Sequence, residues 1–159
     1  MHFIPFYVRY KDLAAKETRT ITLPASYSGL PAGEYGLLEN YCTDDSCDCR
    51  KVMINVVNAK SPREFLATIG YGWESAEFYT EWIGGDKALG KMMVGAYLEP
   101  GGIQTKHAQQ FLELFKAVAL TDDYVEQLKK HYRMFKRYGV KTVEREKRGK
   151  RVVKRGVNW

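Results

Sequence analysis

The sequence has 159 residues, 45% of them hydrophobic and 13% aromatic, with a formal net charge of +6. These values are typical of one folded globular domain that buries a hydrophobic core. The sequence has no apolar run of the roughly 18–20 residues that a membrane span requires, and no secretory signal at its N-terminus. We therefore expect a cytoplasmic protein without a membrane partner.

The first part of the chain has strand-like patterns. Residues 3–10 are aromatic and β-branched, and residues 18–23 alternate polar and apolar side chains. A charged connection at 11–17 separates the two runs, which predicts a loose β-hairpin.

Three further strands are expected after a loop at residues 24–33. Residues 34–41 place Tyr35, Leu37 and Tyr41 on one face, and residues 52–57 carry apolar side chains on both faces, as in a central strand. Residues 65–71 continue the meander.

Helical spacing begins after residue 73. Ser75 and Asp86 are expected to cap two short helices, the second of them reaching Tyr97, and Thr105 to open a third. Thr121 should cap the last helix, whose inner face is predicted to hold Tyr124, Leu128, His131, Tyr132 and Phe135. This order predicts an α+β fold: one domain over residues 1–138, with an antiparallel sheet of four or five strands followed by a C-terminal helical pair.

All three cysteines lie in one short polar connection between two expected strands. Cys42, Cys47 and Cys49 have the spacing Cys-x4-Cys-x-Cys. A tight turn between strands can bring such thiols to one point, as tetrahedral zinc requires. The pattern therefore predicts a zinc site, although a thiolate-rich site suits iron as well.

A structural zinc site needs a fourth ligand, and the histidines are the natural candidates. His131 and His107 both lie on predicted inner helix faces, whereas His2 is at the chain terminus. Water in the fourth position is the remaining alternative.

Other functions for the cysteines stay open. The thiols could be ordinary reduced side chains in an acidic turn, a thiol-redox group, or the ligands of a zinc-dependent hydrolase with an open coordination position. The sequence has no common nucleophile elbow, phosphate loop or complete dinucleotide motif. We favour a non-enzymatic, metal-stabilised module.

The net charge is concentrated in residues 139–159, which have eight basic and two acidic residues and are expected to form a flexible tail. The rest of the chain is neutral. Such a tail could bind nucleic acid with a strong dependence on salt, or an acidic protein. The residues predicted to make this contact are Lys147, Arg148, Lys150, Arg151, Lys154 and Arg155.

Several motifs taken together resemble those of one group of proteins. The cysteine turn, Tyr71-Gly-Trp73-Glu74-Ser and His131-Tyr132-x-x-Phe135 resemble a group of uncharacterised prokaryotic proteins over residues 33–137. The resemblance implies that these segments form one domain. It also implies that His131, rather than His107, is the fourth ligand.

Overall fold

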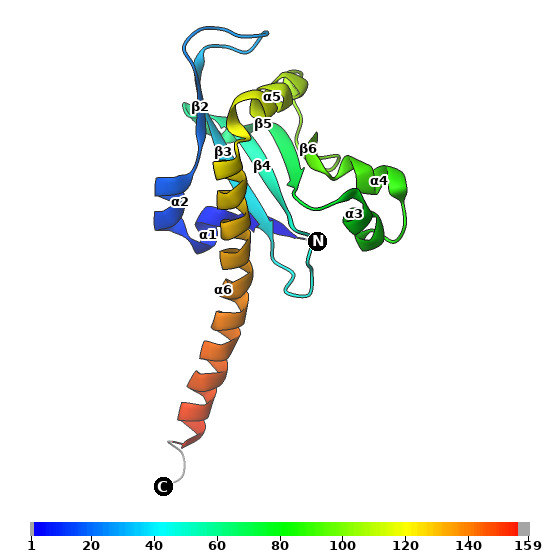
Figure 1. The fold of residues 1–159 in the computed structure, drawn as a ribbon. Helices are drawn as coiled ribbons and strands as arrows, with labels where there is room; N and C mark the ends of the chain where they lie inside the picture. The colour runs from blue at the N-terminus through cyan, green and yellow to red at the C-terminus, as the bar shows by residue number, and fades with distance from the viewer. Residues whose placement is uncertain (1, 156–159) are drawn as a thin grey trace.

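The computed structural model describes the backbone of residues 2–155 and the side chains of residues 2–138 (Figure 1). Within this range six strands form one antiparallel sheet, with the order β1-β3-β4-β5-β6 and with β2 also paired to β3. The strands are β1 (Phe3–Pro5), β2 (Thr20–Leu23), β3 (Gly33–Cys42), β4 (Lys51–Asn58), β5 (Ser61–Gly72) and β6 (Gly95–Leu98). The helices are α1 (Phe6–Arg9), α2 (Lys11–Glu17), α3 (Ala76–Trp82), α4 (Lys87–Met92), α5 (Ala108–Leu114), a π-helical turn η1 (Phe115–Ala119) and α6 (Asp122–Arg155). The predicted α+β class is confirmed.

Strands β3, β4 and β5 form the predicted central meander. Leu37 pairs with Val56, and Ile54 pairs with Ile69 on the next strand. Both Val56 and Val57 are buried although they face opposite sides of the sheet, so β4 is covered on both faces, as its apolar pattern indicated.

The predicted N-terminal hairpin is wrong. β1 and β2 do not pair with each other but both pair with β3, at opposite ends of the same edge. Pro5 ends β1, because it lacks a backbone N–H and its φ of −61° suits the start of a helix. Residues 11–17, read from the sequence as a loop, consist mostly of good helix formers and build α2.

After residue 73 the predicted helix N-caps are confirmed, but the second predicted helix is shorter than expected. The Ser75 and Asp86 side chains accept backbone hydrogen bonds at the starts of α3 and α4, as expected. The helix expected to reach Tyr97 ends at Met92, since Gly95 has φ +72°, which a glycine tolerates best. Ala96 and Tyr97 then form β6, so the sheet has more strands than the four or five predicted.

The C-terminal helices are not the antiparallel pair that was predicted. α5 packs on β5 and β6, whereas α6 packs on α1 and β4, and Figure 1 shows the two helices at a wide angle. Thr121 caps α6 as predicted, accepting a hydrogen bond from the Tyr124 N–H at 3.2 Å. The α6 backbone stays helical past Tyr138 to Arg155, where the sequence predicted a separate flexible tail. Glycine inside a helix costs only about 1 kcal/mol, so Gly139 and Gly149 need not end it.

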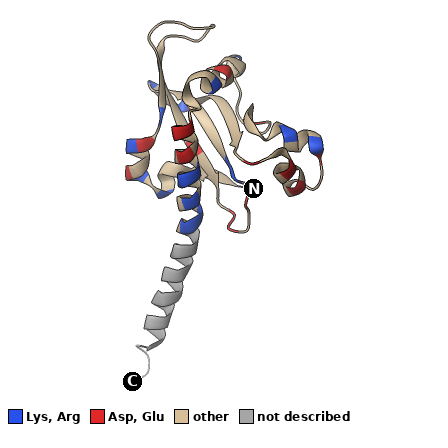
Figure 2. Ribbon diagram, viewed as in Figure 1, with Lys and Arg blue, Asp and Glu red and all other residues tan. Residues whose placement is uncertain are grey.

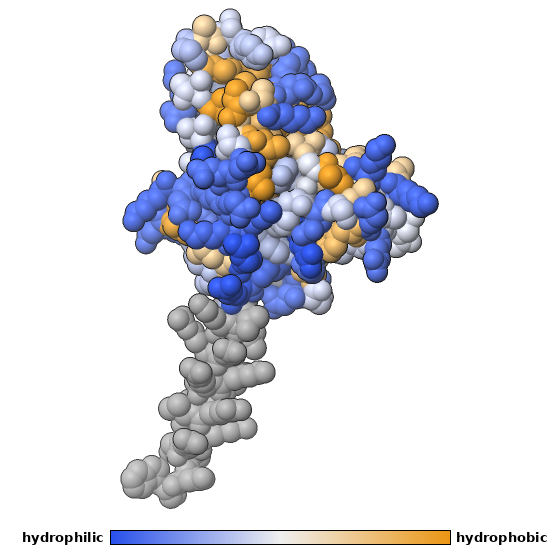
Figure 3. All heavy atoms as spheres, viewed as in Figure 1, coloured by the Kyte–Doolittle hydropathy of each residue, from blue (hydrophilic) through white to orange (hydrophobic). Residues whose placement is uncertain are grey.

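On the face shown in Figure 3, hydrophilic and apolar side chains occupy different regions. Figure 3 shows hydrophilic side chains around α2 and the described part of α6, and apolar side chains gathered towards η1 and β2. Ile21, Leu23, Val118 and Ala119 line a shallow groove at that apolar end. No helix in the described part of the chain is both long and apolar enough to cross a bilayer.

Candidate metal centre

The three cysteines converge at one end of the sheet. Cys42 is the last residue of β3, while Cys47 and Cys49 lie in the loop that leads to β4. The three Sγ atoms lie within 4.8 Å of one another, and Cys42 and Cys49 are fully buried. Tetrahedral zinc with Zn–S bonds of about 2.3 Å needs sulfur atoms about 3.8 Å apart. The group could therefore hold a metal ion after a small contraction.

Local hydrogen bonds determine the path of this loop. The Asp44 carboxylate accepts from both the N–H and the hydroxyl of Ser46, at 2.9 and 2.6 Å. The Cys47 N–H donates to the Asp44 carbonyl at 3.1 Å, which closes a turn. Arg50, with φ +45°, reverses the chain into β4. These two turns bring Cys47 and Cys49 back to Cys42.

Several charged side chains in and beside the loop form ion pairs with one another or with residues outside the loop. Arg50 forms ion pairs with Asp48 at 2.8 Å and with Glu74 at 3.3 Å, and Lys51 pairs with Glu99 at 3.0 Å. The pKa of Asp48 is lowered mainly by its hydrogen bonds to Arg50. A carboxylate close to thiols disfavours thiolate formation, and the ion pair with Arg50 offsets the negative charge of Asp48.

The thiols themselves are difficult to ionise without a metal. Burial, followed by the nearby Cys47, raises the pKa of Cys49 to about 12. Burial and the neighbouring Cys42 also raise the pKa of Cys47. A reactive cysteine needs a lowered pKa, because the thiolate is the nucleophile. The raised pKa values therefore argue against a redox or nucleophilic cysteine, and they are those of reduced thiols unless a bound cation stabilises the thiolates.

The loop also contacts α6 directly. Tyr132 donates its hydroxyl hydrogen to Asp48 at 3.2 Å and accepts the Arg50 N–H at 3.2 Å. Lys136 donates to the Asp44 carbonyl at 3.0 Å. Cross-links of this kind between the cysteine loop and α6 were expected, but through His131 and a shared metal rather than through Tyr132 and Lys136.

The structure removes His131 from the predicted ligand set. His131 is fully buried on α6, and both ring nitrogens are occupied. Nδ1 lies 2.8 Å from the Glu39 carboxylate and Nε2 lies 2.5 Å from the Glu17 carboxylate. Only the three cysteines converge as a ligand group among the described residues. A ring whose two nitrogens both lie within hydrogen-bond distance of carboxylates has no nitrogen free to bind a metal.

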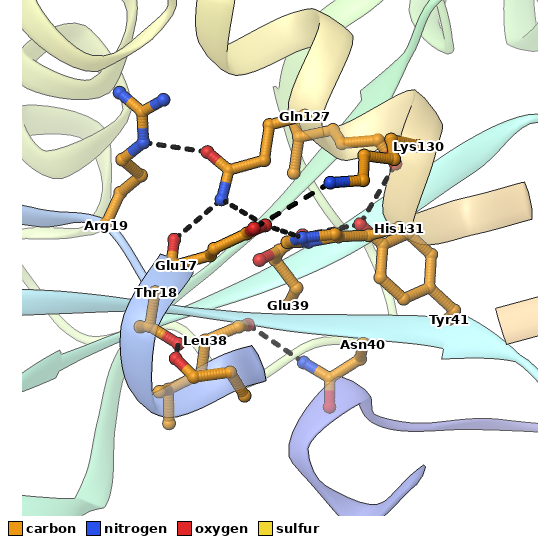
Figure 4. Close-up of polar contacts among 12 residues, drawn as sticks. Glu17, Thr18, Arg19, Leu38, Glu39, Asn40, Tyr41, Gln127, Lys130 and His131 are labelled. Atoms are coloured by element: carbon orange, nitrogen blue, oxygen red, sulfur yellow. Dashed lines mark hydrogen bonds and ion pairs between the residues drawn. The ribbon is translucent and has the colours of Figure 1, made fainter. Parts of the chain in front are cut away.

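Figure 4 shows the network around His131, which joins α2, β3 and α6. Tyr41 donates to the same Glu39 oxygen at 2.6 Å, and Gln127 donates to the Glu17 backbone carbonyl at 2.7 Å. The Phe6 ring stacks on the imidazole, with centroids 4.2 Å apart. Burial lowers the pKa of His131, but the hydrogen bonds and charges of Glu39 and Glu17 outweigh it and raise the pKa overall. The same His131 contact lowers the pKa of Glu17.

Sequence reasoning missed Glu17 and Glu39 as partners of His131. One signal was present: Glu39 alternates with Leu37 and Tyr41 on the apolar face of a strand, so its carboxylate had to be buried and paired. Glu17 gave no such signal. His107 stands at the start of α5 against Gly29 and Phe111, outside the cysteine group.

The described part of α6 is acidic in its first turns and basic from residue 129 onward. Five lysines and arginines lie between residues 129 and 137 without an acidic residue, and Figure 2 shows them following the acidic start of the helix. Arg133 and Arg137 form no ion pair with any described residue. The side chains of the six predicted contact residues, from Lys147 to Arg155, lie outside the described residues.

The fold and the cysteine group together define an α+β protein with a candidate three-thiol metal centre. Comparisons with protein-family models, curated proteins and solved structures found no match to this chain.

Proposed function

We propose that the chain is a zinc-stabilised, non-enzymatic module whose metal is bound by Cys42, Cys47 and Cys49. The convergence of three Sγ atoms within 4.8 Å carries this proposal. Burial of two of the thiols supports a structural role, because a buried thiolate needs a cation beside it. The metal would fix the β3–β4 connection and, through Tyr132 and Lys136, the position of α6.

The first test is the metal content of the untagged protein, purified without added metal or chelator. We expect about one zinc per chain and three thiols that become reactive only after chelation, because bound thiolates are protected. Elemental analysis beside a thiol count measures both quantities and separates zinc from iron. Protein with no metal and three freely reactive thiols would contradict the proposal.

The two alternative functions, a thiol-redox protein and a zinc-dependent hydrolase, require different chemical properties of the same cysteines. A thiol-redox protein needs a readily ionised cysteine, and the raised pKa of Cys47 and Cys49 argues against one. A zinc-dependent hydrolase needs three protein ligands and an open position for water. The identity of the fourth ligand therefore decides between the hydrolase and the module.

We further propose that α6 binds nucleic acid through its basic residues. One observation supports a shared contact surface: the helix backbone continues from Lys129 to Arg155, so the basic residues of the C-terminal segment belong to the same helix as those of the domain. Each phosphate contact by a basic residue releases counterions, which makes binding sensitive to salt.

The prediction is tested with a variant in which the six residues from Lys147 to Arg155 named above become glutamine. Its affinity for a labelled random-sequence oligonucleotide should fall, and the slope of log K against log salt should shrink by about 0.7–0.9 per lost phosphate contact. Fluorescence anisotropy between low and high salt measures this.

A matched control replaces six exposed basic residues outside α6 with glutamine, namely Lys11, Lys60, Arg63, Lys87, Lys91 and Lys106. It should bind like the unmodified chain. Equal binding by both variants would exclude the six residues from Lys147 to Arg155 as a nucleic-acid contact, and no binding by the unmodified chain would exclude α6 as a whole. Binding of an acidic polypeptide alone would assign the helix to a protein partner.

A further inference from the structure

A pocket lies at the opposite end of the sheet from the cysteines. It is lined by residues of α5, of the β4–β5 turn and of the loop before β3. Tyr35 and Asn58 pair at this end of β3 and β4, whereas Cys42 and Lys51 lie at the other end of the same strands. The pocket volume is about 410 Å³, within the range of about 300–1,000 Å³ that is typical of small-molecule sites. The pocket shares no residue with the cysteine group or with the network around His131.

The floor of the pocket is apolar and is held in place by local contacts. Tyr35 and Phe111 are buried and pack edge to face, with ring centroids 5.1 Å apart. The Tyr35 hydroxyl donates to the Pro31 carbonyl at 2.6 Å. Leu30 is buried and Leu66 is half-buried in the same wall. A preformed apolar floor favours a ligand with an apolar body, because binding removes apolar surface from water.

The rim of the pocket has one basic and one acidic side chain without a partner. Lys60 and Glu64 are both exposed, and neither side chain forms an ion pair or a hydrogen bond with any described residue. Unpaired exposed charges are common, but here both signs stand at one apolar pocket. A ligand with an apolar body, a carboxylate and an ammonium group gives each of them a partner.

Two further side chains of the pocket wall can donate to a carboxylate. The Asn58 side-chain oxygen accepts the Lys60 N–H at 2.9 Å, and the NH2 group of the same amide has no acceptor among the described residues. The His107 ring lines the pocket, and its Nδ1 is enclosed without a hydrogen-bond partner in that part of the chain. Enclosed polar atoms are rarely left unpaired in folded proteins. Rotation about the Cβ–Cγ bond can bring Nδ1 to the pocket side of the ring, where its N–H can donate to a ligand.

We propose that this pocket binds a small zwitterion with an apolar side chain, which is the chemistry of a hydrophobic amino acid. The carboxylate of the ligand is bound by Lys60, Asn58 and His107, and its ammonium group by Glu64. The apolar side chain lies on the floor of the pocket. This inference does not depend on the metal centre, because no residue is common to the two sites.

The test compares three small molecules that share one apolar ring and differ in charge. They are L-phenylalanine, hydrocinnamate, which lacks the ammonium group, and phenethylamine, which lacks the carboxylate. NMR titration of the isotope-labelled, untagged full chain at low ionic strength measures their affinities. We expect L-phenylalanine to bind about fivefold or more tightly than either analogue, because each analogue loses one charged contact at an exposed rim.

Two variants of exposed residues assign the charges. Lys60→Gln should weaken the binding of L-phenylalanine and hydrocinnamate and leave that of phenethylamine unchanged. Glu64→Gln should weaken the binding of L-phenylalanine and phenethylamine and leave that of hydrocinnamate unchanged. Lys106→Gln is the matched control, because Lys106 is exposed and directly precedes His107 but does not line the pocket. It should change none of the three affinities.

Other results would overturn the inference. No binding of any of the three molecules at millimolar concentration would exclude the site, and equal affinities for all three would leave only an apolar cavity. The expected order of affinities, unaffected by Lys60→Gln and Glu64→Gln, would place the binding site elsewhere on the chain. Tightest binding of hydrocinnamate, weakened by Lys60→Gln alone, would replace the amino acid with a monocarboxylate.

Discussion

Replacing His131 with leucine should destabilise the protein by roughly 3–5 kcal/mol, the usual cost of removing one partner of a buried ion pair. Leucine fills much of the space that the imidazole occupies against the Phe6 ring, but it cannot form a hydrogen bond or ion pair with either carboxylate. Glu39, which is 3% exposed, then keeps a charge with only Tyr41 as a hydrogen-bond donor among the described contacts. Chemical denaturation at neutral pH measures the loss in the free energy of unfolding.

The same network predicts how stability depends on pH. The pKa of His131 is raised above its ordinary value of 6.5, so its contribution is complete below pH 6.5 and is lost as the pH rises through the raised pKa. The pKa of Glu17 is lowered from 4.5, so its contribution is complete above pH 4.5 and is lost as the pH falls through the lowered pKa. Both contributions to stability are therefore complete between pH 4.5 and pH 6.5. The His131→Leu variant should lose the alkaline limb of this profile and most of the acid limb, because the contact with His131 is the main cause of the lowered pKa of Glu17.

Two controls show whether charge or packing is responsible. Adding Glu39→Gln to His131→Leu removes the uncompensated carboxylate and should recover part of the stability. His107→Leu changes a histidine outside the network and should leave the pH profile unchanged. A loss below about 1 kcal/mol in His131→Leu, with its pH profile intact, would contradict an ionic role for the network.

The parts of the fold predicted from sequence are those governed by local rules. The meander β3–β5 follows from period-two patterns with apolar residues on both faces of β4. The caps at Ser75, Asp86 and Thr121 follow from side-chain oxygens at helix starts. These signals need no knowledge of distant residues.

The errors arose where tertiary pairing decided the outcome. β1 and β6 have three and four residues, too few for a periodic pattern, and each exists because it pairs with a long neighbouring strand. The aromatic run at residues 3–10 was ambiguous between strand and helix, and Pro5 divides it into both.

The candidate site was predicted only in part for the same reason. Three cysteines in one turn are local in sequence, so their convergence was predictable. The position of His131 on the inner face of α6 was also predictable, and it is buried as expected. Its partners were not, because Glu17 and Glu39 are 114 and 92 residues away in the chain. A helix that buries a histidine beside cysteines has the same spacing of apolar residues as a helix that buries one beside carboxylates. The sequence therefore does not distinguish the two environments.

Replacing Cys49 with alanine should abolish metal binding and remove the dependence of thermal stability on zinc. Cys49 is fully buried, and its Sγ is one of the three that converge. A metal that binds only the folded state stabilises it by about 4 kcal/mol when free metal exceeds its dissociation constant a thousandfold. Melting temperatures of the unmodified chain should therefore rise with buffered free zinc and fall with chelator, while those of Cys49→Ala stay constant.

Loss of packing alone would also lower the melting temperature, and Val52→Ala is the matched control. Val52 is fully buried in β4, three residues after Cys49, and carries no ligand atom. Its truncation should cost roughly 1–3 kcal/mol through lost burial and a cavity. Val52→Ala should therefore melt early yet still respond to zinc. If the unmodified chain binds zinc without any rise in melting temperature, the metal has no structural role, and the cysteine loop must then be considered an open or exchangeable site.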